Sequence, residues 1–339
     1  MPSTLLTGAN SFVAAHIINA LVDARHYVTG TVRRAEAGDE IRALHPEWKK
    51  HLDIVVVEDI TSEASWDTVF KGAHFDHVVH VAAPLLDNPK NTDYDRDFLK
   101  PSVEGNLALL RSAQNYAPNL KSIVVTGSIN ASTSGSPEEL SAGPITDSTW
   151  LPITPDQARA KKNAYISYCS GKKEGELAIW EFVKANSPKF TVTVLLPAII
   201  FGPPMEPLKG GVKGLHFSSN LVYSLINGSN KTVPATAFPS YIDARDLADA
   251  HVRALTEAKV ANKRINIGGQ GMTFTALTNS LAKIPELKDR LPIESGEDKA
   301  VTPANIVADE ANEALHMTFR SMDETMADTA RRILELEKQ

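Results

Sequence analysis

The chain has 339 residues, and its 35 lysines and arginines against 41 aspartates and glutamates give a formal net charge of −6. No run of basic residues is dense enough to follow a phosphate backbone, which argues against nucleic acid as a partner. Apolar residues make up 42% of the chain, but no uninterrupted apolar stretch reaches the roughly 20 residues that a membrane-spanning helix requires. The composition therefore indicates a globular protein without a membrane partner.

The first residues and the cysteine content bear on the compartment. Residues 1–8 already have the pattern of a strand and a turn, which leaves no room for a secretory signal. Cys169 is the only cysteine, so neither an intramolecular disulfide nor a multi-cysteine metal site can form. We therefore expect a protein of the reducing cytoplasm.

Short apolar runs alternate with longer amphipathic stretches. The opening is a βαβ unit with a strand at 3–7, a helix at 11–24 and a strand at 27–32. The same rhythm predicts strands at 54–57, 77–82, 122–126 and 191–196, and helices at 64–70 and 103–116. Strands that are nearly continuous runs of valine, isoleucine and leucine are buried on both faces, which predicts a parallel sheet covered by helices.

The composition changes after Pro197. Residues 202–211 are rich in glycine and proline, and we interpret them as a mobile loop over a site. A helix at 243–258 and a strand at 264–267 are expected to return the chain to the sheet. Helical patterns then follow at 274–282 and 323–337.

These elements predict an α/β fold, a Rossmann-type doubly wound parallel sheet with a smaller C-terminal substrate lobe. The nucleotide-binding body is expected to comprise residues 1–196 and 241–267. The substrate-binding lobe is expected to comprise residues 197–240 and 268–339.

The turn between the first strand and the first helix has small residues at three positions, Gly8, Ser11 and Ala14. In dinucleotide-binding folds these positions permit a tight turn, close approach of the backbone to a pyrophosphate, and close packing of helix on strand. Only one of them is glycine here, but small side chains meet most of the steric demand, and the helix N-terminus offers free amides to phosphate. The alternative is an ordinary serine-capped turn.

The end of the second strand bears on the choice of dinucleotide. Folds that prefer NAD generally carry an acid there, which accepts from the ribose 2′-hydroxyl. Arg33 and Arg34 follow this strand instead, and a forked guanidinium suits a 2′-phosphate. We therefore predict NADP(H), with Arg33 as the main contact; the alternative is two solvated arginines. After the third strand, Asp59 and Ile60 stand where an aspartate and an apolar residue can hold adenine.

Tyr168 and Lys172 are four positions apart on a predicted helix, so they share one face of it. A tyrosine has an unperturbed pKa of about 10, and it needs a nearby cation to exchange a proton near neutral pH. Lys172 supplies that cation. Ser128, at the end of a buried strand, is suited to donate a hydrogen bond to a carbonyl oxygen on which negative charge develops. The alternative is an exposed helix pair with no chemistry.

Motifs over nearly the whole chain resemble those of extended short-chain dehydrogenase/reductases, and most of all their dihydroflavonol reductase-like and fungal aldehyde/ketone reductase branch. The matching positions are 8–16, Arg33, 59–60, 80–84, 125–128, Tyr168 with Lys172, 196–197 and 241–246. The resemblance implies a doubly wound sheet of about seven strands and hydride transfer from NADPH to a substrate C=O group. It also implies that Ser128, Tyr168 and Lys172 form a catalytic triad in which Tyr168 protonates the nascent alkoxide.

The turn and the resemblance together assign a set of cofactor contacts. The set is Gly8, Asn10, Ser11, Phe12, Val13, Arg33, Asp59, Ile60, Ala82, Ala83, Lys172, Pro197 and Ile199.

Several positions depart from the family pattern. Ser11 and Ala14 stand where many relatives have glycine, and Gly127 stands where many have a second serine. Ser102 occupies the place of the asparagine that extends the proton relay in many extended enzymes, which leaves that relay to water or backbone.

Two other functions fit parts of the pattern. An NAD-dependent sugar-nucleotide epimerase or dehydratase would usually carry the acid that is missing after the second strand. A dinucleotide sensor without catalysis would have little need of Ser128, Tyr168 and Lys172 together. We therefore predict an NADP-dependent oxidoreductase acting on the CH–OH or C=O group of a small-molecule carbonyl substrate, and make no prediction of its oligomeric state.

Three further features are expected to be structural or remain undecided. His74, His77 and His80 recur every third residue, but strand side chains alternate between faces, so these histidines cannot bind one metal ion together. Cys169 is expected to be a packed thiol. Tyr165 either lines the pocket or packs.

Overall fold

The central sheet orders the whole molecule. A computed structural model describes residues 1–86, 92–236, 239–292 and 304–338. Within these residues the sheet has seven parallel strands in the order β3-β2-β1-β4-β5-β6-β9. Their bounds are β1 Ser3–Leu6, β2 Tyr27–Val32, β3 Leu52–Val56, β4 His77–His80, β5 Ser122–Thr126, β6 Thr191–Pro197 and β9 Arg264–Ile267. The order reverses between β1 and β4, which confirms the predicted doubly wound sheet and places the ligand crevice at the carboxyl ends of these strands.

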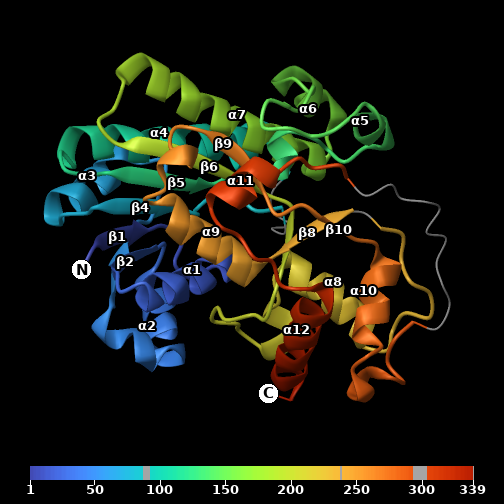
Figure 1. The fold of residues 1–339 in the computed structure, drawn as a ribbon. Coiled ribbons are helices and arrows are strands. Elements are labelled where there is room, and N and C mark those ends of the chain that lie inside the picture. Colours follow the sequence, from blue (N-terminus) through green and yellow to red (C-terminus); the bar gives the residue numbers. More distant parts are fainter. Residues whose placement is uncertain (87–91, 237–238, 293–303, 339) are drawn as a thin grey trace.

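Helices cover both faces of the sheet (Figure 1). One hydrophobic cluster joins the sheet to α1 (Phe12–Asp23), α2 (Ala35–Leu44), α9 (Ala244–Ala254) and α11 (Asp309–Ala314). A second cluster joins it to α3 (Glu63–Gly72), α4 (Lys100–Tyr116) and α7 (Ala164–Asn186). Consecutive strand residues alternate between the clusters: Leu6 belongs to the first and Leu5 to the second. This alternation explains why the strands are apolar throughout.

A third hydrophobic cluster lies beside the sheet. It is formed by α8 (Phe217–Ile226), α10 (Phe274–Leu281) and α12 (Met322–Glu337), which lie together in Figure 1. A small sheet of β10 (Gln270–Gly271), β8 (Ser240–Asp243) and β7 (Ile199–Phe201) connects this cluster to the central sheet, because β7 follows β6 after one residue. The short helices α5 (Pro137–Ser141) and α6 (Pro155–Lys161) precede α7. No helix in the described part of the chain is both long and apolar enough to cross a membrane.

The helix expected at 243–258 is shorter than predicted. It begins after Asp243, whose carboxylate accepts from the amide of Arg245 at 2.8 Å and caps the helix, and it ends at Ala254. Helix α11 packs against the sheet, because Ala311 and Ala314 belong to the first cluster.

The glycine- and proline-rich segment is anchored where it begins. The carbonyl of Pro203 hydrogen-bonds His16 Nε2 at 3.0 Å, the carbonyl of Pro204 accepts from Arg332 Nε at 3.1 Å, and the carbonyl of Met205 hydrogen-bonds His45 Nε2 at 2.8 Å. Because these partners come from α1, α12 and the residue after α2, any movement of the predicted loop has to begin beyond residue 205.

Candidate active site

The turn after β1 brings Gly8 close to the backbone that follows β4. Gly8 has φ of +69°, a left-handed conformation, and a Cβ at this position would lie 3.3 Å from Ala82 Cα. The amide of Ala9 donates to the Thr31 carbonyl at 2.8 Å, which fixes the turn against β2. Gly8 therefore meets the demand for a tight turn at the point where the strand order reverses.

The N-terminus of α1 is suited to hold an anion. The amides of Phe12 and Val13 lie in the first turn of the helix, where no intrahelical acceptor is available. The Ser11 Oγ atom is buried and has no hydrogen-bond partner among the described residues, and Asn10 is exposed beside it. A buried hydroxyl without a partner, next to free amides, fits a phosphate group at this turn.

Arg33 and Arg34 lie exposed immediately after β2. Asp59, after β3, accepts from the amide and the hydroxyl of Thr61, both at 2.8 Å. These hydrogen bonds, together with the nearby positive charges of Lys100 and Arg33, keep the pKa of its carboxyl below the ordinary value. The carbonyl of Ile60 accepts from an indole N–H of α3 at 2.8 Å. The predicted phosphate and adenine contacts thus share the β2–β3 side of the crevice.

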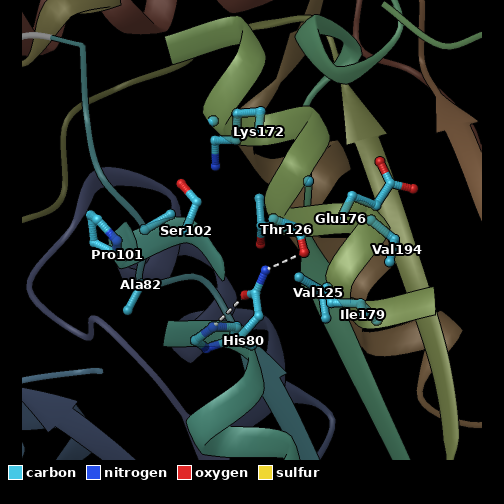
Figure 2. Close-up of a pocket in the computed structure, with 15 residues that line it drawn as sticks. His80, Ala82, Pro101, Ser102, Val125, Thr126, Lys172, Glu176, Ile179 and Val194 are labelled. Carbon is cyan, nitrogen blue, oxygen red and sulfur yellow. Dashed lines mark hydrogen bonds between the residues drawn. The ribbon is translucent and has the colours of Figure 1, made fainter. Parts of the chain in front are cut away.

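A hydrogen-bonded chain that the sequence analysis missed links this turn to α7. Thr7 Oγ1 accepts from the amides of residues 81 and 82, both at 2.9 Å, and hydrogen-bonds His80 Nδ1 at 2.9 Å. His80 Nε2 hydrogen-bonds Asn106 Oδ1 at 3.1 Å, and Asn106 Nδ2 donates to the Gly175 carbonyl at 2.9 Å (Figure 2). Burial lowers the pKa of His80 to about 4, so its ring is neutral at neutral pH. The series of hydrogen bonds from Thr7 to Gly175 therefore contains no charged group.

The proposed triad residues come from the two elements that flank the crevice. Ser128 is buried at the end of β5, and Tyr168 and Lys172 share one face of α7. Lys172 Nζ lies 5.8 Å from the centroid of the Tyr168 ring. Figure 2 shows Lys172 pointing from α7 into a cavity, which Ala82 and Gly127 also line.

The cavity is also lined by Ala83 and by Ser102, the residue in the place of the relay asparagine. Burial lowers the pKa of Lys172 to about 8, and the carboxylate of Glu176 opposes this shift. That carboxylate is itself paired with Arg264, with Oε1 and Nε 2.7 Å apart. The ammonium form of Lys172 therefore predominates at neutral pH.

The chain after β6 completes the edge of the crevice. Pro197 is the last residue of β6 and pairs with Ile267 of β9. Ile199 is the first residue of β7 and pairs with Tyr241 of β8. The predicted site residues thus lie at or beyond the carboxyl ends of β1, β2, β3, β4, β5 and β6, or on α7, along one edge of the central sheet.

The histidines of β4, Cys169 and Tyr165 pack or form hydrogen bonds within the protein. His77 Nδ1 hydrogen-bonds Ser122 Oγ at 2.8 Å, away from the partners of His80, and no group of metal-binding side chains occurs among the described residues. Cys169 is buried and its pKa is raised by burial to about 12, as expected of a packed thiol. Tyr165 packs in the same cluster as Cys169 and has a hydrogen-bonded hydroxyl.

Comparison with known proteins gives consistent matches. The model of the NAD dependent epimerase/dehydratase family matches residues 4–268. The chain is 30% identical to the NADPH-dependent methylglyoxal reductase GRE2 of Saccharomyces cerevisiae, covering 99% of each protein. It is 31% identical to the ketoreductase azaE of Aspergillus niger, covering 98% of this chain and 97% of that protein. The crystal structure of Gre2 from Candida albicans in complex with NADPH superposes with a TM-score of 0.88, at 27% identity and 99% coverage of each chain.

Proposed function

The chain belongs to the NAD dependent epimerase/dehydratase family, and within that family we propose that it is an NADP(H)-dependent reductase of aldehydes or ketones. The observation that carries this proposal is the position of Lys172. It lies one helical turn from Tyr168, and it lines the same cavity as Ala82 and Gly127, which adjoin the dinucleotide turn and Ser128 respectively. The resemblance to fungal reductases predicted from the motifs agrees with the matched proteins.

The choice of NADP(H) rests on two independent observations. Arg33 and Arg34 stand after β2, where an acid would favour NAD. The similar yeast enzyme is described as NADPH-dependent, and the similar Candida albicans structure contains NADPH. The cofactor contacts that we propose are those expected from the sequence. The turn from Gly8 to Val13 would bind the pyrophosphate, Arg33 the 2′-phosphate, and Asp59 with Ile60 the adenine.

The other cofactor contacts lie nearer the reacting group. Ala82 and Ala83 adjoin the turn, Lys172 is expected at the nicotinamide ribose, and Pro197 and Ile199 are expected at the nicotinamide amide. When bound, the cofactor supplies the hydride that adds to the substrate carbonyl carbon.

The protein supplies the proton and stabilises charge. Ser128 donates a hydrogen bond to the substrate oxygen as negative charge develops there. The hydroxyl of Tyr168 transfers its proton to that oxygen, which leaves a phenolate and completes the alcohol. The ammonium of Lys172 stabilises the phenolate until solvent returns a proton to it.

The domain division expected from the sequence is part of this proposal. Residues 1–196 and 241–267 would bind the cofactor, and residues 197–240 and 268–339 would shape the substrate pocket. The third hydrophobic cluster supports the division, since its members come from the second group of residues except for Tyr241. We also place the protein in the cytoplasm, with a small-molecule carbonyl as its substrate.

The test is a panel of aldehydes and ketones, including methylglyoxal, mixed with the purified protein and either NADPH or NADH. We expect loss of the reduced-nicotinamide absorbance with at least one carbonyl, and faster loss with NADPH. Tightly held NAD and interconversion of nucleotide sugars would identify an epimerase instead. Binding of NADPH without turnover of any carbonyl would favour a dinucleotide sensor.

A further inference from the structure

The hydroxyl of Ser128 has a hydrogen-bond partner within the protein. Ser128 caps the single-turn 3-10 helix Ile129–Ala131, and its Oγ accepts from the amide of Asn130 at 3.2 Å. The same hydroxyl donates to Asn130 Oδ1 at 3.3 Å. This distance exceeds the roughly 2.5–3.0 Å of well-formed hydroxyl–oxygen hydrogen bonds, so Asn130 orients the hydroxyl but holds it weakly.

The side-chain amide of Asn130 is fixed in one orientation by its other contacts. Its Nδ2 group donates to the Thr133 carbonyl at 3.1 Å and to Tyr165 Oη at 2.9 Å. Both amide hydrogens are thereby used, and Oδ1 faces Ser128. The opposite orientation would turn Oδ1 towards the carbonyl of Thr133, where two acceptors would repel each other.

Tyr165 connects this amide to the catalytic helix. Its hydroxyl accepts from Asn130 and donates to the Ser134 carbonyl at 2.9 Å. Burial raises the pKa of Tyr165, which favours the protonated hydroxyl that donates to Ser134. Tyr165 stands three residues before Tyr168 on α7, so the network joins the turn that carries Ser128 to the helix that carries the acid.

We propose that Asn130 and Tyr165 are positioning residues for Ser128: they give its hydroxyl hydrogen a weak resting acceptor and hold the Ser128 turn in register with Tyr168. The inference rests on the proposed reductase function, because it concerns the hydrogen bond from Ser128 to a substrate carbonyl. When substrate binds, its carbonyl oxygen replaces Asn130 Oδ1 as the acceptor of the Ser128 hydroxyl hydrogen. The serine side chain therefore reaches the substrate without a larger movement of the backbone.

A double-mutant cycle tests whether Asn130 acts through Ser128. Loss of an oxyanion donor costs about 10²- to 10³-fold in kcat, so we expect that range for Ser128→Ala and an intermediate loss of about tenfold for Asn130→Ala. In the Ser128→Ala background, Asn130→Ala should cause no further loss, since the group it positions is absent. An equal fold loss in both backgrounds would overturn the proposal.

The pH profile of Asn130→Asp supplies a readout that a purely structural role would not move. An ionised carboxylate at this position binds the Ser128 hydroxyl more firmly, repels the nascent alkoxide and cannot donate to Thr133. We expect kcat to be low above neutral pH and to recover as the introduced carboxyl is protonated, a recovery that the unmodified enzyme lacks. A loss that is the same at every pH would contradict the assignment.

Tyr165→Phe keeps the ring and its packing, and this variant tests the proposal even if Asn130→Ala does not fold. We expect a severalfold lower kcat, with an unchanged dissociation constant for NADPH and an unfolding temperature that stays the same within a few degrees. An unchanged kcat would overturn the role of Tyr165.

Matched controls are Tyr116→Phe at the end of α4 and Asn19→Ala, whose side chain contacts the exposed Asp23. If the unmodified protein reduces no carbonyl, the proposed function fails; if it does and the cycle is additive, only the positioning role fails.

Discussion

The ammonium nitrogen of Lys172 lies 5.8 Å from the centroid of the Tyr168 ring, one turn further along α7. Burial lowers the pKa of this lysine to about 8, and it is the charged form that stabilises a Tyr168 phenolate. The kcat/KM for carbonyl reduction should therefore fall as the pH rises through about 8, because the ammonium is lost. In Lys172→Arg the guanidinium stays charged, and the residual activity should lack this decline. The same decline in both proteins would assign it to another group.

Tyr168→Phe removes the transferable proton and keeps the ring. General acid catalysis contributes roughly 10²- to 10⁴-fold, and we expect kcat to fall by that amount with a substrate whose reduction is limited by chemistry. The dissociation constant for NADPH, measured by fluorescence titration, should stay within about twofold, since losing one hydroxyl removes at most one hydrogen bond to the cofactor. Retention of more than about a tenth of the original kcat would refute Tyr168 as the acid.

Arg33→Ala should change cofactor preference. Loss of a charge-assisted contact to a 2′-phosphate costs about 1.5–3 kcal/mol, which corresponds to a rise of about 10- to 150-fold in the KM for NADPH. The KM for NADH should change little, because NADH lacks that phosphate. Arg34→Ala is the matched control and should have the smaller effect. Equal effects of Arg33→Ala on both cofactors would remove Arg33 from the phosphate contact.

Glu206→Gln should alter stability in a pH-dependent way. Glu206 is buried, its Oε1 has no hydrogen-bond partner in the part of the chain that the structure describes, and burial raises its pKa from 4.5 to about 7. His216, 3.8 Å away, offers no charge, because burial lowers its pKa to about 3. The folded state therefore binds the Glu206 proton more tightly than the unfolded state does, and this contribution to stability declines as the pH rises from 4.5 through about 7.

Glutamine cannot ionise, so at about pH 8 the variant should be more stable than the unmodified protein, with an unfolding free energy higher by at most about 3 kcal/mol. It should therefore unfold at a higher temperature at this pH. At about pH 4 the two proteins should differ little. Thermal unfolding followed by circular dichroism at both pH values measures this difference. The exposed Glu58→Gln is the matched control. A variant less stable at the higher pH would contradict the argument.

Local patterns predicted the parts of the site that depend on neighbouring residues. The i, i+4 spacing of Tyr168 and Lys172 holds wherever a helix forms, and the place of Gly8 directly after a strand fixes the turn. The Thr7–His80 hydrogen bond joins residues 73 positions apart, and the Asn130–Tyr165 bond joins residues 35 apart. No periodicity encodes such pairs, because they exist only once the sheet and α7 are assembled.

The elements that were missed are short or have an ambiguous composition. Strands β7 and β10 have three and two residues, too few for an alternation to be recognised. Helix α2 contains Gly38, which lowers its helix propensity, although Ile54 packs so closely on this glycine that a Cβ there would lie 2.7 Å from Ile54 Cγ2. Tertiary packing selects the glycine here and overrides the local preference.

The three side chains that hold the carbonyls of residues 203–205 also set a boundary for exchanging this loop with that of a relative. His16, His45 and Arg332 are far apart in the sequence. If residues 203–205 of this chain are moved into a relative, the relative must carry suitable hydrogen-bond donors at all three corresponding positions. A transplant that begins at residue 207 leaves all three donors with their original acceptors. Grafts of the second kind keep these three anchors, and they are the cleaner way to test our proposal that this segment shapes the substrate pocket.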